Sequence, residues 1–235
     1  MTKAAVSEIR ERFDGDVERF SNVITGQTSV MDAALALEVG TEAVRRLVQN
    51  GQTLLDLGCG AGNWTVKLLE KLPNLACTLV DISRPMLERA RERVAPLSRQ
   101  NITILESDFR TVQFEAESFD IITAGATLHH LRDDDEWIAV FTKIYAALRH
   151  NGCFLISDLV THENEILARY DWERWGAYLE NAGGPEMRET ILTLCEREDT
   201  PRPLNWQMEL LRRTGFKSIE ILHKNACFAT FCAIK

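Results

Sequence analysis

Short apolar runs alternate with amphipathic segments between residues 51 and 160. Five such runs lie at 53–57, 76–80, 101–105, 119–123 and 153–157. Between them, apolar residues recur at the spacing of an α-helix at 64–72, 85–94 and 135–148. Runs that stay apolar on both faces and are separated by helices are typical of a parallel sheet covered by helices. The pattern therefore predicts an α/β fold.

The two flanking regions are more helical. Amphipathic stretches occupy 6–20 and 30–48, and a region rich in Trp, Tyr, Arg and Glu follows at 163–200. We therefore expect an N-terminal helical segment at 1–50 that closes the site. The main domain would span 51–235, with a helical insertion at about 163–203.

The chain closes with a helix at 205–214 and two more apolar runs at 218–222 and 227–234. Only residues 223–226 separate these two runs. Such a short connection joins antiparallel strands, so we expect a hairpin at one edge of the sheet.

The composition is that of an ordinary globular protein, with 45% hydrophobic and 26% charged residues among 235. No run of 18 apolar residues occurs, so we expect no transmembrane helix. The N-terminus becomes charged before the apolar stretch of a secretory signal can form, which favours a cytoplasmic location. The net charge of −8 argues against binding of long nucleic acid.

The six cysteines form no Cys-x-x-Cys pair, and no Cys/His cluster has the spacing of metal ligands. We therefore expect free buried thiols and no metal site.

A glycine-rich turn after the first strand is the strongest chemical signal. The sequence Leu-Asp-Leu-Gly-Cys-Gly-Ala-Gly occupies 55–62 and leads into a helix. Glycine suits such a turn because a Cβ would block close approach of a ligand to the backbone. Three carboxylates, Asp56, Asp81 and Asp108, stand at the carboxyl ends of predicted strands, where open α/β sheets bind ligands. Asp81 follows Gly62 by 19 residues, near the spacing of an acidic residue that meets a ribose.

This segment resembles motif I of the class I S-adenosylmethionine-dependent methyltransferases. The spacing to Asp81, the Ser-Asp-Phe at 107–109, and the run from Phe119 to the Leu-His-His-Leu at 128–131 are similar to later motifs of that family. The resemblance implies a Rossmann-like sheet of seven strands, mostly parallel, whose last strand is antiparallel. It also implies S-adenosylmethionine as cofactor and S-adenosylhomocysteine as product.

The resemblance further implies roles for individual residues. Backbone atoms of Gly58, Cys59 and Gly60 would contact the methionyl part of the cofactor, and Asp56 would hold its amino group. Asp81 would bind the ribose hydroxyls and Asp108 the adenine amine. The remaining residues would enclose the adenine ring or form the floor of the site: Ile82, Met86, Phe109, Ala124 and Gly125.

A dinucleotide site is the competing interpretation of the glycine turn. NAD-binding turns have the pattern Gly-x-Gly-x-x-Gly, whereas here the third glycine comes one residue early and Asn63 takes the last position. No residue downstream resembles the acid of a hydride-transfer site, which favours S-adenosylmethionine.

Two residues are candidates for general-base catalysis. Asp158 ends the fifth strand, and His129 follows the fourth, where an imidazole can take a proton near neutral pH. Packing under a lid is the alternative for His129.

The inserted helical region supplies four candidate lid residues: Arg169, Tyr170, Trp172 and Trp175. They would form an aromatic and cationic cover over the substrate. The spacing of Trp172, Trp175 and Leu179 equally fits a stripe that packs on the sheet.

The expected partner is a small-molecule methyl acceptor, whose nucleophilic atom the fold does not define. Phe13-Asp14, the turn at Phe216 and the strand at 227–231 are in addition similar to the carboxy-S-adenosylmethionine synthases that serve tRNA modification. The family's tyrosine for the extra carboxylate has no counterpart at 14–50, and Arg188 and Arg197 are the candidates for its arginine. A non-catalytic binding module also stays open, as does the oligomeric state.

Overall fold

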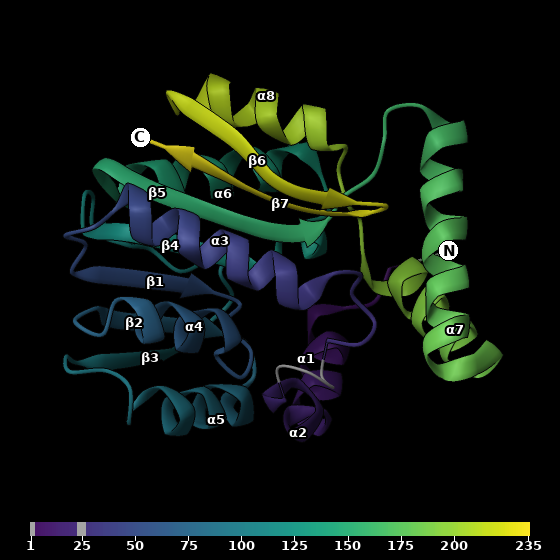
Figure 1. Cartoon of the computed structure of the whole chain (residues 1–235), viewed down its shortest axis with the longest axis horizontal. Helices are drawn as coiled ribbons and strands as arrows, with labels where there is room; N and C mark the ends of the chain where they lie inside the picture. The colour runs from purple at the N-terminus through teal and green to yellow at the C-terminus, as the bar shows by residue number, and fades with distance from the viewer. Residues whose placement is uncertain (1–2, 23–26) are drawn as a thin grey trace.

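The computed structural model describes residues 3–22 and 27–235. The chain forms a seven-stranded sheet in the order β3-β2-β1-β4-β5-β7-β6 (Figure 1). The strands are β1 (Thr53–Leu57), β2 (Ala76–Asp81), β3 (Ile102–Glu106), β4 (Phe119–Gly125), β5 (Leu148–Leu159), β6 (Ser218–Asn225) and β7 (Phe228–Ile234). Only β7 runs antiparallel to its neighbours β5 and β6. The predicted Rossmann-like sheet with an antiparallel last strand is therefore confirmed.

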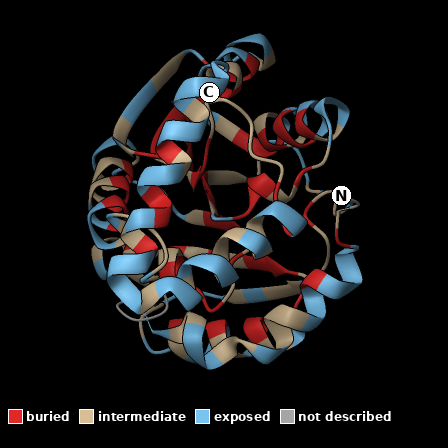
Figure 2. Cartoon of the chain, turned by 90° about the vertical axis from the view of Figure 1, so that its right-hand side faces the viewer, coloured by how far each residue is buried: buried red, intermediate tan, exposed pale blue. Residues whose placement is uncertain are grey.

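Helices cover both faces of the sheet. They are α1 (Val6–Gly15), α2 (Val17–Ser21), α3 (Ala33–Leu47), α4 (Asn63–Lys71), α5 (Arg84–Val94), α6 (Asp134–Ala147), α7 (Glu165–Glu198) and α8 (Leu204–Thr214), with a short 3-10 helix η1 (Leu128–His130). One apolar core joins α3, α4 and α5 to the sheet, and a second lies under α6 and α8. Figure 2 shows the buried strand segments between these two helical layers.

The fifth strand begins earlier than its apolar run predicts. It starts at Leu148, whereas the run begins at Cys153, because the intervening residues 149–151 are polar and partly or fully exposed. The α3 helix packs against α4 and against β5, β6 and β7. The segment at 1–50 thus contains α3, which packs on the sheet, in addition to α1 and α2. The division into a closing segment and a main domain stays a prediction.

The insertion forms α7, which stands away from the sheet in Figure 1. Its path breaks at Gly183 and Gly184, whose dihedral angles are not helical, and Gly184 has a φ of +82°. Among the described residues, no helix combines the length and the apolar character that a membrane span requires.

We expect Gly125→Ala to destabilise the fold because the end of β4 packs tightly on α4. A Cβ at Gly125 would lie 2.1 Å from Nε1 of Trp64. Overpacking of this kind typically costs about 1–3 kcal/mol of unfolding free energy. Urea denaturation would measure the loss. Gly15→Ala is the matched control, because no atom lies within 4 Å of that Cβ, and its effect should stay within about 0.5 kcal/mol. Equal stability of the two variants would contradict the prediction.

Candidate functional site

A cavity of about 260 Å³ opens at the carboxyl ends of β1, β2, β4 and β5. The glycine turn and the ends of β2 and β3 line one part of it, which we call the cofactor end. Residues of α1, α2, η1 and α7 line the other part, which we call the acceptor end. This is the edge where parallel α/β sheets place their ligands.

The turn from β1 into α4 runs through the left-handed region of backbone space. Gly58, Gly60 and Gly62 have φ values of +61°, +49° and +80°. A Cβ at Gly58 would lie 2.1 Å from Oγ1 of Thr127, while a Cβ at Gly60 would meet no atom within 4 Å. Gly58 is thus required for packing, and Gly60 leaves its backbone open to a ligand. Cys59 between them also lines the cavity.

Asp81 connects the end of β2 to the glycine turn. Its Oδ2 accepts a hydrogen bond from the Gly60 N–H at 2.8 Å, and its Oδ1 accepts one from the Ser83 N–H at 2.9 Å. Burial raises the pKa of Asp81 to about 6, although these backbone donors oppose the shift. The carboxylate lines the cavity and fixes the turn at the same time.

Asp56 lies on the inner side of the turn and does not line the cavity. Its two oxygens accept hydrogen bonds from Oγ1 of Thr65 at 2.7 Å and Oγ1 of Thr123 at 2.8 Å. Burial raises the pKa of Asp56 to about 6. The structure therefore does not bring this carboxylate to the position where a cofactor amino group would meet it. The side chain joins β1 to α4 and β4 instead.

The expected adenine pocket gathers beside the ends of β2 and β3. Ile82, Met86, Asp108 and Phe109 all line the cavity. Nε of Arg110 donates to both oxygens of Asp108 at 3.0 Å. Burial would raise the pKa of Asp108, but Arg110 holds it below its usual range.

On the floor of the cavity, Gly125 lines the cavity, whereas Ala124 faces the apolar core. The roles given to these residues and to the adenine pocket stay predictions.

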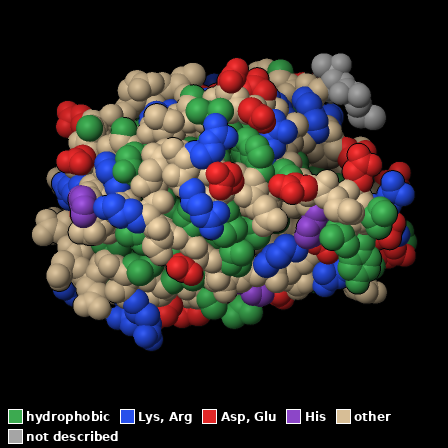
Figure 3. All heavy atoms as spheres, turned by 90° about the horizontal axis from the view of Figure 1, so that it is seen from above, with side chains coloured by type: hydrophobic (Ala, Val, Ile, Leu, Met, Phe, Trp, Pro, Cys, Tyr) green, Lys and Arg blue, Asp and Glu red, His purple; other side chains and the backbone are tan. Residues whose placement is uncertain are grey.

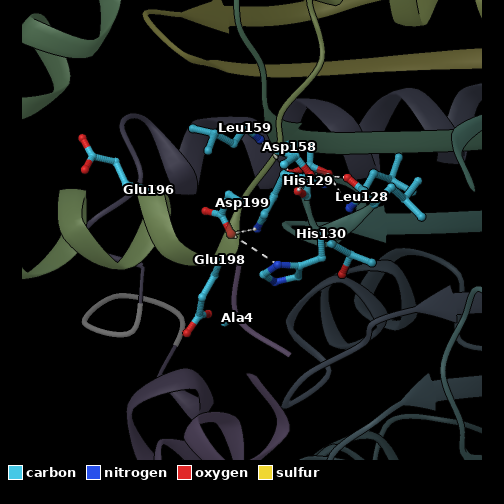
Figure 4. A network of polar contacts seen from close by, with 12 residues as sticks. Ala4, Leu128, His129, His130, Asp158, Leu159, Glu196, Glu198 and Asp199 are labelled. Carbon is cyan, nitrogen blue, oxygen red and sulfur yellow. Dashed lines mark hydrogen bonds and ion pairs between the residues drawn. The ribbon is translucent and has the colours of Figure 1, made fainter. Parts of the chain in front are cut away.

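Asp158 is fully buried behind His129. It accepts hydrogen bonds from the N–H groups of Leu128 and His129, and it bonds Nδ1 of His129 (Figure 4). Its side chain has 0% exposure, and its bond to Nδ1 orients the imidazole. The catalytic roles of Asp158 and His129 stay predictions, with Asp158 as the positioning group.

His129 carries a perturbed pKa. Burial alone would lower it, but the carboxylates of Asp158 and Asp199 raise the pKa to about 9. Nε2 of His129 lies 3.7 Å from Oδ1 of Asp199. At neutral pH the His129 imidazole is therefore protonated and positively charged, and it lies between the carboxylates of Asp158 and Asp199.

Only part of the predicted lid reaches the site. Trp175 lines the cavity and donates from Nε1 to the Ser29 carbonyl at 2.7 Å. Trp172 packs on Trp175 at 5.0 Å between ring centroids without lining the cavity. Arg169 and Tyr170 are exposed, because the helical register turns them away from Trp175. In this structure Trp175 alone of the four lines the cavity, and Trp172 packs on it. The cover by all four residues stays a prediction.

Several residues at the acceptor end were not predicted from sequence. Arg12 of α1 donates from Nη2 to Oε2 of Glu198 at 2.6 Å, and the Glu198 side chain is 1% exposed. Arg132 donates to the carbonyls of Glu198 and Ala4. These contacts connect α1, the segment after η1 and the end of α7. We call these connected segments the roof of the cavity. None belongs to a sequence motif, because their partners come from segments far apart in the chain.

The chain is similar in sequence to known proteins, one of them over almost its full length. Residues 54–152, which hold β1 to the start of β5, match a family model described as a methyltransferase domain. The chain is 25% identical to the carboxy-S-adenosyl-L-methionine synthase of Nautilia profundicola, over 97% of this chain and 96% of that protein. It is 27% identical to the demethylmenaquinone methyltransferase of Lactococcus lactis, over 79% of this chain and 74% of that protein.

A solved structure shares the fold along the whole chain. It is the 1,6-didemethyltoxoflavin-N1-methyltransferase of Burkholderia thailandensis, with bound 1,6-didemethyltoxoflavin and S-adenosylhomocysteine. The TM-score is 0.65 at 19% identity, and the match covers 100% of this chain and 92% of the other. At this identity the likeness concerns the fold alone.

We expect Asp56→Asn to change the pH dependence of stability. The folded pKa of about 6 exceeds the unfolded value of about 3.9, so ionisation of Asp56 lowers stability as the pH rises between those values. The variant lacks this loss. Its unfolding free energy relative to wild type should therefore increase by up to about 3 kcal/mol between pH 4 and pH 8. Urea denaturation at both pH values measures the difference.

Asp120→Asn is the control for this experiment. Burial would raise the pKa of Asp120, but Gln52, Thr53 and Arg149 lower it, so its contribution to stability is lost as pH falls. The relative stability of this variant should change with pH in the opposite direction. If the difference in unfolding free energy between Asp56→Asn and the wild type did not change with pH, the raised pKa of Asp56 would be contradicted.

Proposed function

Because residues 54–152 form a class I S-adenosylmethionine-dependent methyltransferase domain, as the glycine turn predicted, we propose that the chain methylates a small-molecule acceptor. S-adenosylmethionine is the cofactor that this domain implies. We propose further that the acceptor has an apolar, ring-sized body with one polar group. The non-catalytic binding module is the alternative that the experiment below separates.

The lining of the acceptor end is the observation that carries this proposal. Aromatic and aliphatic side chains dominate it: Phe13, Phe20, Met31, Trp175, Ile191, Leu194 and Phe228. Charged groups that are paired with one another, among them His129 and Asp199, share this lining. A concave, mainly apolar surface with polar groups at set positions suits a small molecule. A long nucleic acid would need a continuous basic surface. On the face in Figure 3, basic and acidic side chains are interspersed.

The cofactor end suits S-adenosylmethionine in its shape and donors. The open backbone at Gly60 would admit the methionyl part, and Asp81 would accept from the ribose hydroxyls. Asp108 would accept from the adenine amine, between Ile82 and Phe109. Bound there, the cofactor supplies an activated methyl group that an acceptor nucleophile displaces in line.

The chain's own contribution to the transfer is alignment and exclusion of water. The aromatic residues of the acceptor end would hold the body of the acceptor, and the roof of α1 and α7 would close over it. His129 presents Nε2 toward the cavity, so it would exchange a hydrogen bond with the acceptor's polar group. Asp158 would keep the imidazole in that orientation.

Carboxy-S-adenosylmethionine synthesis is the second candidate, favoured by the full-length similarity to such a synthase. That activity requires a cation for the extra carboxylate. Arg188 and Arg197 do not line the cavity. The arginines that do line it, Arg12, Arg19, Arg110 and Arg132, are each bonded to carboxylates or carbonyls within the described parts of the chain. This arrangement favours methyl transfer.

Mass spectrometry of the cofactor product tests the two candidates directly. The protein is incubated with S-adenosylmethionine and a library of small aromatic and apolar acceptors, and the nucleotide products are analysed. Methyl transfer yields S-adenosylhomocysteine together with an acceptor that is heavier by one methylene unit. We expect this outcome for at least one acceptor.

Other products would overturn the proposal. In a parallel incubation that adds a small carboxylic acid as carboxyl donor, a cofactor that gains the mass of CO2 while the donor loses it would support the synthase. Tight binding of S-adenosylmethionine without turnover on any acceptor or extract would support a non-catalytic module. The variant Arg12→Gln loses the ion pair with Glu198 that joins α1 to α7. This loss should raise the KM for the acceptor more than the Kd for the cofactor.

Binding of S-adenosylmethionine should weaken at acidic pH through Asp81. Its carboxylate must be ionised to accept from two hydroxyls, and its pKa is about 6, with Asp14 nearby adding to the upward shift. The Kd should be nearly constant above pH 7 and rise about tenfold per pH unit well below 6. Calorimetric titration between pH 5 and pH 8 measures it.

Two variants make this result specific. Asp81→Asn should bind at least about tenfold more weakly at pH 8, with little pH dependence, because it loses charge-assisted hydrogen bonds. Asp108→Asn should keep the pH dependence, since the pKa of Asp108 is already lowered. Unchanged binding in Asp81→Asn would remove the ribose role of this residue.

A further inference from the structure

Three side chains with metal-binding atoms converge at the acceptor end. His129 and His130 belong to η1, and Asp199 follows the last residue of α7 (Figure 4). Oδ1 of Asp199 lies 3.7 Å from Nε2 of His129 and 3.3 Å from Nδ1 of His130. One donor atom from each residue lies within 4.8 Å of the others. All three residues line the cavity.

These separations are close to those of a coordinated ion. Zn²⁺ binds imidazole nitrogen and carboxylate oxygen at about 2.0–2.2 Å, so two ligand atoms of a tetrahedral site stand roughly 3.3–3.5 Å apart. The two nitrogen–oxygen distances differ from this by a few tenths of an ångström. The third separation, between the two imidazole nitrogens, is at most 4.8 Å, so the imidazoles would have to turn toward each other to share one ion.

The surrounding contacts already orient the donors. Asp158 bonds Nδ1 of His129, which leaves Nε2 as the atom directed toward Asp199. A carboxylate that holds the far nitrogen of a histidine is the common outer support of metal-binding imidazoles. The Thr200 N–H donates to the His129 carbonyl at 2.7 Å, so the segment that carries Asp199 is tied to η1.

One donor atom lacks a hydrogen bond. Nδ1 of His130 is buried and makes no hydrogen bond of good geometry in the described structure, although it lies 3.3 Å from Oδ1 of Asp199. An unsatisfied buried polar atom typically costs about 1–3 kcal/mol, so native structures seldom keep one without a reason. The nearest printed neighbour of this nitrogen is Oδ1 of Asp199, and a metal ion bound to both atoms would satisfy the two of them.

We propose that His129, His130 and Asp199 bind one divalent transition-metal ion of the zinc class. Two imidazoles and one carboxylate form the donor set that such ions take at sites with an open coordination position. The open position would face the cavity and accept an oxygen or nitrogen of a ligand there. Ion binding does not depend on the proposed function, whereas ligation of a methyl acceptor by the ion rests on it.

Titration of the metal-free protein with Co²⁺, followed by its visible ligand-field spectrum, tests the proposal. We expect one ion per chain, displaced by Zn²⁺ and not by Mg²⁺ or Ca²⁺, because nitrogen donors select against the hard cations. Asp199→Asn and His130→Ala should each weaken Co²⁺ binding by more than tenfold. Asp158→Asn should weaken it about 10–100-fold through the orientation of His129.

His162→Ala is the matched control. His162 also pairs with a buried carboxylate, with Nε2 2.9 Å from Oδ2 of Asp171, but it lies outside the three-residue cluster. This variant should bind Co²⁺ like the wild type. Far-UV circular dichroism and binding of S-adenosylhomocysteine establish that each variant is folded.

A measurement on the wild type alone covers variants that fail to fold. The chain has five histidines, so Co²⁺ should shift or broaden the ring-proton NMR signals of two of them and leave three unchanged. Absence of saturable binding, equal affinity in folded Asp199→Asn, or a sulfur charge-transfer band from Cys195 would each overturn the proposed donor set. Metal binding without any methyl transfer would overturn only the proposed function.

Discussion

The left-handed turn between β1 and α4 is the constraint on which the site depends. Its three glycines take positive φ values, and the hydrogen bond from the Gly60 N–H to Asp81 fixes the turn against the neighbouring strand. A side chain at Gly58 would collide with Thr127 and displace the start of η1. The backbone surface at Gly60 and the position of the two histidines are therefore set by the same few residues.

Buried carboxylates recur at this edge of the sheet, and each has a different set of partners. Asp56 is satisfied by two threonine hydroxyls and joins three elements of the core. Asp81 is bonded by backbone N–H groups and faces the cavity. Asp158 orients His129. Three aspartates near strand ends thus have different surroundings, one within the core, one at the cavity and one behind an imidazole, because burial and the nearest donors differ.

The acceptor end is assembled from segments that contribute little on their own. Arg12 of α1 and Glu198 of α7 form a half-buried bidentate pair, and Arg132 donates to the carbonyls of Glu198 and Ala4 beside it. The apolar lining comes from α1, α2, α7 and β7. Under the proposed function this part of the molecule would select the acceptor, because the fold alone does not define a substrate.

The sequence by itself determined the sheet, the glycine turn and the carboxylates at the strand ends, because periodicity and turn chemistry are local properties. The cofactor role of Asp56 stays a prediction, and its carboxylate bonds two threonines in this structure. Of the four predicted lid residues, Arg169 and Tyr170 are exposed.

Only the tertiary structure brought Asp199 to His129, which it follows by 70 residues, and Arg12 to Glu198. The expectation of no metal site rested on spacing along the chain. His129, His130 and Asp199 come together because the end of α7 packs beside η1. That contact depends on tertiary packing, which a local sequence pattern does not predict.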